Sequence, residues 1–475
     1  MEMKKILKNA SYLFLGNITV RFMLAIATIL FARYVGPVEY GILSVALAFS
    51  GVVCYFTDAG LTHTFMREAT KKEANLSELI SSYFRIRLIL AMVISILTFI
   101  FVENFYQDDL MKNIIYWIVF PTMFGATLQG IGNAYFQATE RMQFTAGISV
   151  LQGVTASFAL ILGMFFKWPL VFVAAMYGVS SIITGLIALI LVLRNTKVHN
   201  GWNKSILNQL LSFTINGIII MMLPQLGPLI LEKVSSLSEV GFFATAFKIP
   251  AVLYQIPGVI AAAFYPKLFS FGNGGQLNEH RNLSAFELKL MSFIGFGISF
   301  PFIANPEYWI VSLLGYEWTR SAEALAILSF MVILQSINYP LADFLTTKGQ
   351  QTRRTLVMSI GLVVAITLYI ILGRQFGMAG GAFAAIITEI TLLIGFTISI
   401  EKGVSLLLRG LLFNLFGFLA SLLIYHTLLA KIYPFPALSL GSIIYALIVI
   451  TLDRQIRNKV FDVIRQKGIL KKRFN

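Results

Sequence analysis

Long apolar segments separated by short polar stretches make up nearly the whole chain. A membrane-spanning helix needs about 20 mostly apolar residues, and fourteen segments of the sequence approach or exceed that length. Their unbroken apolar runs favour helices, because the strands of a membrane barrel would show shorter segments of alternating hydrophobicity. The expected spans are 11–33, 38–58, 84–103, 113–138, 144–166, 169–193, 207–231, 239–266, 285–304, 322–347, 354–373, 378–400, 408–429 and 434–452.

Composition supports an integral membrane protein. Charged residues make up 12% of the chain, about half of the share that a soluble domain uses to cover its surface. The net charge of +15 suggests nucleic-acid or acidic-lipid binding, but most Lys and Arg gather in segments expected on one side of the membrane. This is the positive-inside bias of a plasma-membrane protein, here with both termini in the cytoplasm. We therefore expect the basic tail to contact membrane lipids, and we expect no nucleic-acid partner.

The chain resembles itself at a shift of about 200 residues. The stretch VEYGILSVALAFSGV at 38–52 aligns with SEVGFFATAFKIPAV at 238–252, which pairs Glu39 with Glu239 and Gly41 with Gly241. Each copy holds six expected spans, so both copies enter the membrane from the same side and are related by an axis along the membrane normal. We predict an all-α membrane protein with two pseudo-symmetric six-helix lobes around a central cavity, plus two C-terminal helices.

Four regions follow from this plan. They are an N-lobe at 1–193, a polar cytoplasmic linker at 194–206, a C-lobe at 207–400, and a C-terminal part at 401–475 with the last two spans and a basic tail. Segment 61–83 mixes charged and apolar residues, so we expect a surface helix or an ordered loop there.

Two cations lie deep inside expected spans. Arg21 is near the middle of the first span, with Asn17 on the same helix face, and Lys248 lies in the eighth span, with Gln255 on its face. A charge at the membrane centre costs about 2.5 kcal/mol or more on insertion scales. We interpret both cations as lining water or a ligand. The alternative for Arg21 is a structural bond to a carbonyl or an acid.

Prolines punctuate the seventh and eighth spans. Because proline removes a backbone donor and clashes with the preceding turn, both spans are predicted to be bent or broken, a feature of transporter helices beside a binding site. The prolines are Pro224, Pro228, Pro250, Pro257 and Pro266.

Amides form stripes on two further spans. Gln129, Asn133 and Gln137 share one face of the fourth span, and Gln335 and Asn338 lie in the tenth. Such groups are costly against lipid, so they are predicted to line the cavity. Hydrogen bonding between helices is the alternative for the first stripe.

Glu389 is the deepest acid, near the middle of the twelfth span. It is the main candidate for coupling to a proton or sodium gradient, with a structural, hydrogen-bonded glutamic acid as the alternative. Asp343, near the inner end of the tenth span, is a second candidate, or simply a solvated acid. Cys54 is the single cysteine and the four histidines are scattered, so neither a metal site nor a cofactor is expected.

Three motifs carry a family resemblance. ARYVGPVEYGILS at 32–44, DAGLTHTFMREATK at 58–71 and FQATERM at 136–142 resemble the polysaccharide-flippase (Wzx-like) branch of the multidrug/oligosaccharidyl-lipid/polysaccharide (MOP) exporter superfamily. The resemblance is densest over 8–142, and the fourteen-span plan extends it over the whole chain. The motifs are specific to the branch rather than to one sugar.

The resemblance implies a transporter that turns an oligosaccharide linked to undecaprenyl diphosphate from the inner to the outer leaflet. Arg21 and Lys248 fall where basic residues of the cavity would meet the diphosphate. Asp58, Arg67 and Glu68 lie in the motif after the second span and are expected to form an inner gate. Other proteins of glycan assembly are possible partners.

Three alternatives remain open on the sequence. A cation-coupled drug or metabolite exporter would use the same scaffold. A membrane glycan polymerase or ligase would need catalytic groups near the outer face, and the short outer loops disfavour it. A nontransporting scaffold of the glycan assembly machinery would require the buried charges to be purely structural.

Overall fold

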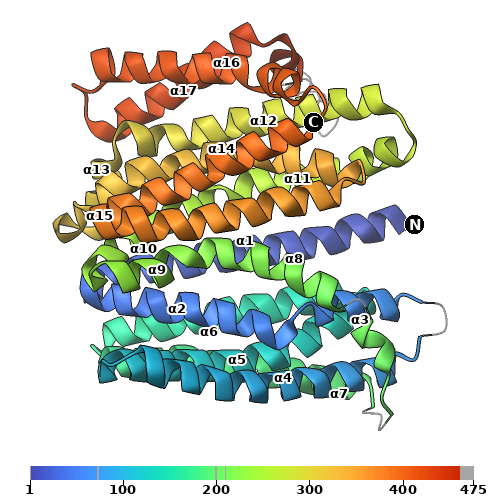
Figure 1. The fold of residues 1–475 in the computed structure, drawn as a ribbon. Helices are drawn as coiled ribbons and strands as arrows, with labels where there is room; N and C mark the ends of the chain where they lie inside the picture. The colour runs from blue at the N-terminus through green and yellow to red at the C-terminus, as the bar shows by residue number, and fades with distance from the viewer. Residues whose placement is uncertain (1, 72–73, 198–200, 209, 460–475) are drawn as a thin grey trace, which may run out of the picture. The chain divides into compact units, whose positions relative to one another are not determined.

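Helices account for almost all of the residues that the structure describes. The computed structural model describes residues 2–71, 74–197, 201–208 and 210–459, and it contains no strand within them. The helices are α1 Glu2–Val35, α2 Pro37–Asp58, α3 Leu61–Ala69, α4 Leu76–Phe105, α5 Asp109–Ala138, α6 Met142–Phe165, α7 Leu170–Asn195, η1 Lys204–Leu207, α8 Leu210–Met222, η2 Leu223–Gln225, α9 Leu226–Val234, α10 Leu237–Leu253, α11 Gln255–Asn273, α12 Leu277–Ala304, α13 Pro306–Leu314, η3 Tyr316–Trp318, α14 Ser321–Thr347, α15 Gln351–Ser399, α16 Gly403–Ile424, η4 Tyr425–Leu429 and α17 Pro434–Leu452. Figure 1 shows their order along the chain.

The predicted membrane spans are confirmed in outline. Twelve helical stretches in the described residues are long and apolar enough to cross a membrane. One of them, α15, contains the two expected spans 354–373 and 378–400, which meet at Gly377, whose φ is 55° and ψ −127°. The helix α1 covers the expected first span. The chain is therefore a multi-pass, all-α membrane protein.

The expected surface segment 61–83 is only partly confirmed. The short helix α3 buries Leu61 and Phe65 rather than lying on the surface. The membrane helix α4 begins at Leu76, eight residues before the expected span, because Asn75 caps it: the Asn75 side-chain oxygen accepts the backbone N–H of Glu78 at 3.3 Å. Residues 76–83 thus belong to the span.

Both proline-rich spans are broken, as predicted. The seventh span divides into α8, the 3-10 turn η2 that contains Pro224, and α9. The eighth divides at Tyr254 into α10 and α11, three residues before Pro257. Pro257 has no N–H to donate to the carbonyl of Leu253, so the ladder of helical hydrogen bonds is interrupted there.

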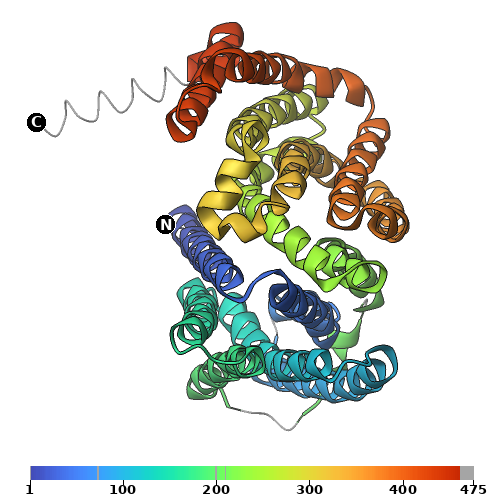
Figure 2. The ribbon, with the colours of Figure 1, turned by 90° about the vertical axis from the view of Figure 1, so that its left-hand side faces the viewer.

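Packing divides the chain into two compact units. The first comprises Met1–Thr245, Leu313–Trp318 and Ile366–Gly381. Within it α5 packs along α7, α1 along α6, and α2 against α5, and Figure 2 shows these blue to green helices nearly end-on. Its core includes Leu61, Phe65, Tyr83 and Phe136. The first unit thus takes in α8 and α9, which follow the expected linker.

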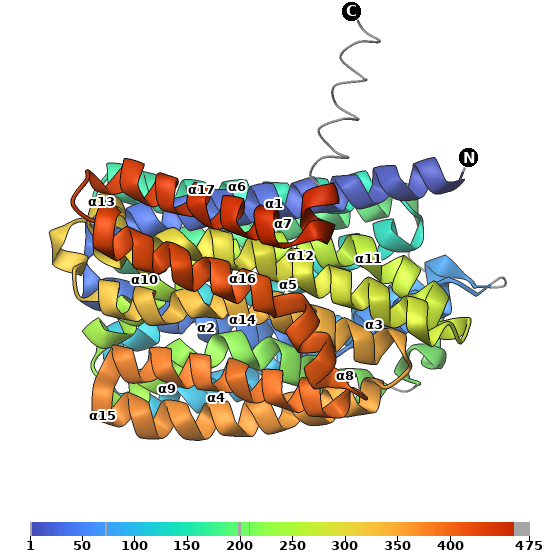
Figure 3. The same cartoon turned by 90° about the horizontal axis from the view of Figure 1, so that it is seen from above.

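The second unit comprises Ala246–Ser312, Thr319–Ala365 and Ala382–Asn475. The helices α14 and α16 both pack on α12, and α17 packs on α12 and α16; Figure 3 shows α16 and α17 running along this group. Phe296, Phe300, Phe418 and Tyr445 form the aromatic centre of its core, with the rings of Phe296 and Phe418 5.0 Å apart. The C-terminal helices are therefore integral to this unit. The expected lobe boundaries stay a prediction.

Candidate functional site

Arg21 projects from the middle of α1 with its side chain exposed. It forms no hydrogen bond or ion pair with any residue that the structure describes, so the structural alternative, in which a carbonyl or an acid holds it, has no support there. The side chain of Asn17 lies outside the described part. An exposed, unpaired guanidinium in a membrane helix needs water or an anionic ligand beside it.

Lys248 lies on α10, a turn and a half before the break at Tyr254, and its side chain is partly buried. It too has no hydrogen-bond or ion-pair partner among the described residues. Gln255, the first residue of α11, donates its side-chain N–H to the Ala251 carbonyl at 3.3 Å. That bond leaves the amide oxygen of Gln255 available.

Glu389 sits in a cage of amides. Gln335 Nε2 donates to one carboxyl oxygen at 2.5 Å, and Asn338 Nδ2 donates to the other at 2.8 Å. Asn338 also bonds the Glu389 carbonyl at 3.1 Å, while its own Oδ1 is buried without a partner in the described chain. The structure therefore joins three residues that the sequence had assigned to two separate roles. The two carboxyl oxygens and the carbonyl oxygen of Glu389, together with Asn338 Oδ1, are hard ligands of the kind that bind a small cation, and the carboxyl group can also take up a proton.

Two further acids, Glu287 and Asp343, lie in the same unit as Glu389. The side chain of Glu287 on α12 is fully buried, and neither carboxyl oxygen has a hydrogen-bond partner within the described residues. Asp343 on α14 is close enough for its charge to act on Glu287, and Arg354 acts on Asp343 in turn. Asp343 itself is buried, with 9% of its surface exposed, so the expectation of a solvated acid is wrong. Sequence reasoning missed Glu287, because the expected span began at 285 and placed it at the membrane edge.

Asp58 belongs to a buried polar network with Arg87, which sequence reasoning also missed. Arg87 Nη1 lies 3.6 Å from Asp58 Oδ1 and donates to the Tyr83 hydroxyl at 2.8 Å. Thr62 donates to the same Asp58 oxygen at 2.6 Å. A side chain at position 130 would overlap the guanidinium, so Gly130 makes the space for it. The signal in the sequence is the four-residue spacing of Tyr83 and Arg87 on one helix face.

Arg67 and Glu68, the other expected gate residues, form a separate cluster. Glu68 is buried and pairs with Arg67 at 3.1 Å and with Lys71 at 2.5 Å. Arg67 also donates to the Asn208 carbonyl at 2.9 Å. This cluster attaches α3 to the segment that follows the linker, whereas Asp58 attaches α2 to α4. The expected gate is thus two polar clusters rather than one.

The first amide stripe forms hydrogen bonds between helices. Gln129 Nε2 donates to Gln152 Oε1 at 2.8 Å and to the Ser181 carbonyl at 3.1 Å, and Gln152 Nε2 donates to the Ser181 hydroxyl at 3.0 Å. Gln129 therefore fits the alternative of helix–helix bonding. Asn133 has a buried Oδ1 without a partner in the described part. Gln137 is partly buried on the same face.

Metal ligands do not gather in the described chain, where no group of three His, Cys, Asp or Glu residues could hold an ion. Cys54 is a free thiol. The candidate functional groups of the described chain are therefore unpaired cations, buried carboxyl groups and amides.

The chain is similar to solved structures of a flippase and of multidrug transporters. A lipid II flippase, MurJ, in an inward closed conformation matches with a TM-score of 0.73 and 15% identity over 96% of this chain and 99% of that one. A multidrug resistance MATE family transporter of the MOP superfamily, in an inward-facing conformation, matches with a TM-score of 0.64 and 14% identity over 81% and 95%. An outward-facing conformation of a transporter of the same description matches with a TM-score of 0.61 and 15% identity over 85% and 96%.

The fold is therefore that of the MOP exporter superfamily. A family model described as polysaccharide biosynthesis protein matches residues 6–271. The chain belongs to this family of polysaccharide biosynthesis proteins, as the motifs near its N-terminus indicated. No curated protein sequence matches it significantly.

Proposed function

We propose that this protein flips a polyprenyl-diphosphate-linked oligosaccharide across the plasma membrane, by alternating access, for the synthesis of a surface polysaccharide. The membership in a polysaccharide biosynthesis family and the fold of membrane exporters support a membrane transporter. The observation that carries the substrate class is the presence of two cations, Arg21 and Lys248, in membrane helices without a protein partner in the described chain.

The charges of substrate and protein are complementary in this proposal. A lipid diphosphate carries about two negative charges, and an arginine binds phosphate through two parallel N–H donors. An unpaired cation is costly in lipid, so it is retained when a ligand compensates it. Arg21 and Lys248 are each assigned to the head group, with Asn17 and Gln255 as hydrogen-bonding neighbours in sequence.

Two further roles are proposed for the buried acids. Glu389, with Gln335 and Asn338, is assigned to gradient coupling by a proton or a sodium ion. Its carboxyl group is held by neutral amide donors, so no fixed cation competes with the coupling ion. Asp343 is a second coupling candidate through its proximity to Glu287. Asp58, Arg67 and Glu68 are assigned to the inner gate, where ion pairs exchange partners between states. The termini are assigned to the cytoplasm from the distribution of Lys and Arg.

The test is flipping of a fluorescent polyprenyl-diphosphate saccharide by the full chain in proteoliposomes. We expect the double variant Arg21→Glu with Lys248→Glu to lose flipping by at least about tenfold, because two charge-assisted hydrogen bonds become repulsive contacts. Lys112→Gln is the matched control, since Lys112 already pairs with Glu103 at 2.7 Å at the start of a span. It should flip normally.

Two outcomes would overturn the proposal. One is full flipping by the double charge-reversal variant, which would remove the assigned site. The other is gradient-driven export of dyes by the wild-type protein with no movement of the saccharide lipid, which would identify a drug or metabolite exporter.

A further inference from the structure

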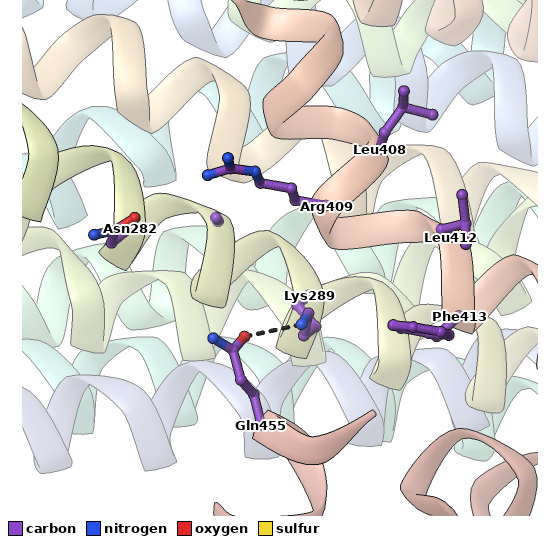
Figure 4. A pocket seen from close by; sticks show the side chains of 8 residues that line it. Asn282, Lys289, Leu408, Arg409, Leu412, Phe413 and Gln455 are labelled. Atoms are coloured by element: carbon purple, nitrogen blue, oxygen red, sulfur yellow. Dashed lines mark hydrogen bonds between the residues drawn. The ribbon is translucent and has the colours of Figure 1, made fainter. Parts of the chain in front are cut away.

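A groove in the second unit combines cations with exposed apolar side chains. It has a volume of about 570 Å³ and runs between α12 and α16, beside the segment that follows α17. Its lining residues, shown in Figure 4, are Asn282, Ala285, Lys289, Leu408, Arg409, Leu412, Phe413 and Gln455. None of these residues takes part in the sites described above.

One wall of the groove is a fixed ion pair. Lys289 Nζ lies 2.8 Å from Asp453 Oδ2 and donates to Gln455 Oε1 at 2.8 Å. The other oxygen of Asp453 accepts the backbone N–H groups of Gln455 and Ile456 at 2.8 and 3.2 Å. The side chains of Lys289 and Asp453 are 12% and 3% exposed, so Asp453 neutralises this lysine and fixes the wall.

The opposite wall carries a cation that has no partner in the described chain. Arg409 is exposed on α16 and forms no hydrogen bond or ion pair with any described residue. Figure 4 shows its side chain extending from α16 on the side of Asn282. Because Gln455 accepts from Lys289 through its oxygen, its NH₂ group remains free to donate. The groove therefore presents one positive charge and several neutral donors, which suit an anion.

The same wall is apolar on either side of the arginine. Leu408, Leu412 and Phe413 are 53%, 56% and 39% exposed, and in a membrane helix such a face contacts lipid chains. Arg409 lies in the second turn of α16, near the ends of helices where head groups are within reach. A ligand that pairs with Arg409 and also covers these apolar side chains carries an anion next to a long apolar body, as a phospholipid does.

We propose that this groove binds an anionic glycerophospholipid of the surrounding membrane. The phosphate accepts hydrogen bonds from the Arg409 guanidinium and from the amides of Asn282 and Gln455, and an acyl chain lies along Leu412 and Phe413. Basic pockets between membrane helices are a known way of holding such head groups. A bound lipid would join α12, α16 and the segment after α17, so it would stabilise the second unit.

The test compares lipids and variants of the full chain purified in detergent. Phosphatidylglycerol and phosphatidylcholine with identical acyl chains are added, and binding is measured by native mass spectrometry and by the melting temperature. We expect phosphatidylglycerol to bind the wild-type protein and raise its melting temperature. Arg409→Gln should bind about tenfold more weakly, because one charge-assisted contact is lost.

Two further variants make the result specific. Arg409→Lys keeps the charge but loses the paired donors, so it should bind with intermediate strength. Arg454→Gln removes an exposed cation that does not line the groove and should bind as the wild type does. Equal losses for Arg409→Gln and Arg454→Gln would reduce the effect to general charge attraction and overturn the proposal. A full stabilising effect of inorganic phosphate alone would also overturn it, since the acyl chain would then contribute nothing.

Discussion

Gly41 and Gly241, which the expected internal repeat pairs with each other, face each other where α2 and α10 meet. A Cβ atom on Gly41 would overlap the carbonyl oxygen of Leu237, and one on Gly241 would overlap the carbonyl oxygen of Pro37. Each repeat copy thus contributes the same small residue to the same contact. Both positions therefore require a residue without a side chain at this crossing.

This contact predicts that Gly41→Ala and Gly241→Ala are both destabilising, by about 1–3 kcal/mol, because the added methyl group forces two backbones apart. The measurement is the melting temperature of the purified variants. Gly147→Ala is the control: Gly147 lies within α6, and an added Cβ would have nothing within 4 Å of it, so alanine should be neutral or stabilising. Similar behaviour of all three variants would contradict the close contact.

The Asp58–Arg87 pair predicts a large effect of removing the cation. Arg87→Met should cost about 3 kcal/mol or more, because it leaves a largely buried carboxylate without its partner. The double variant Arg87→Met with Asp58→Asn should recover part of the loss, and thermal unfolding of the four proteins gives the coupling energy. Gly130→Ala should destabilise less than Arg87→Met, since the end of the flexible Arg87 side chain can shift away from the added methyl group.

Arg85 provides the matched control on the same helix. It is partly exposed and donates to the Gly201 carbonyl at 3.3 Å, so Arg85→Gln should change stability by less than about 1 kcal/mol. An Arg87 variant as mild as this one would show that the buried pair is not needed for folding.

The amide cage predicts that two substitutions of Glu389 differ in how much stability they cost. Glu389→Ala leaves the buried donors of Gln335 and Asn338 unsatisfied and should cost about 2–3 kcal/mol. Glu389→Gln should cost much less, because the unpartnered Oδ1 of Asn338 can turn to accept from the new amide. If Glu389 couples an ion gradient to transport, the Gln variant is folded but no longer responds to the gradient. Gradient-driven uptake into proteoliposomes checks this, and a normal response would remove Glu389 from the coupling role.

Glu287 predicts a stabilising substitution. Its carboxyl group is fully buried and has no partner in the described chain, so Glu287→Met removes a desolvation cost without breaking a bond, and unfolding should become about 1–2 kcal/mol harder. Residues retained at such a cost are often functional, so transport should fall. Glu279→Met, at an exposed position of the same helix, should change stability by about 0.5 kcal/mol or less. Unchanged transport by Glu287→Met would leave the acid without a functional role.

The helices could be predicted from the sequence because each span is decided locally, by a run of apolar residues long enough to cross the membrane. Their starting residues could not, since hydropathy does not show how far a helix continues through the polar residues at its end. The spans that hold Arg87 and Glu287 begin at Leu76 and Leu277, eight residues earlier than expected in both cases. The expected starts at 84 and 285 placed both side chains within three residues of the membrane edge.

The site could be predicted as a set of residue types but not as a set of partners. Glu389, Gln335 and Asn338 were found because each is polar within an apolar run, yet α14 and α15 bring them together through packing that no local pattern encodes. Similarly, Asp58 and Arg67 lie in one motif, but Asp58 pairs with Arg87 on α4. Spacing along one helix gives a shared face, and the partner across the interface depends on the tertiary fold.

The bonds of Gln129, Gln152 and Ser181 restrict how the first unit can deform. These groups satisfy one another across α5, α6 and α7, and lipid offers no water to replace a broken bond. We therefore expect α5, α6 and α7 to keep their mutual packing when the first unit deforms. The turn at Leu223–Gln225 resists bending less, because Pro224 lacks the backbone N–H that a continuous helix would use there.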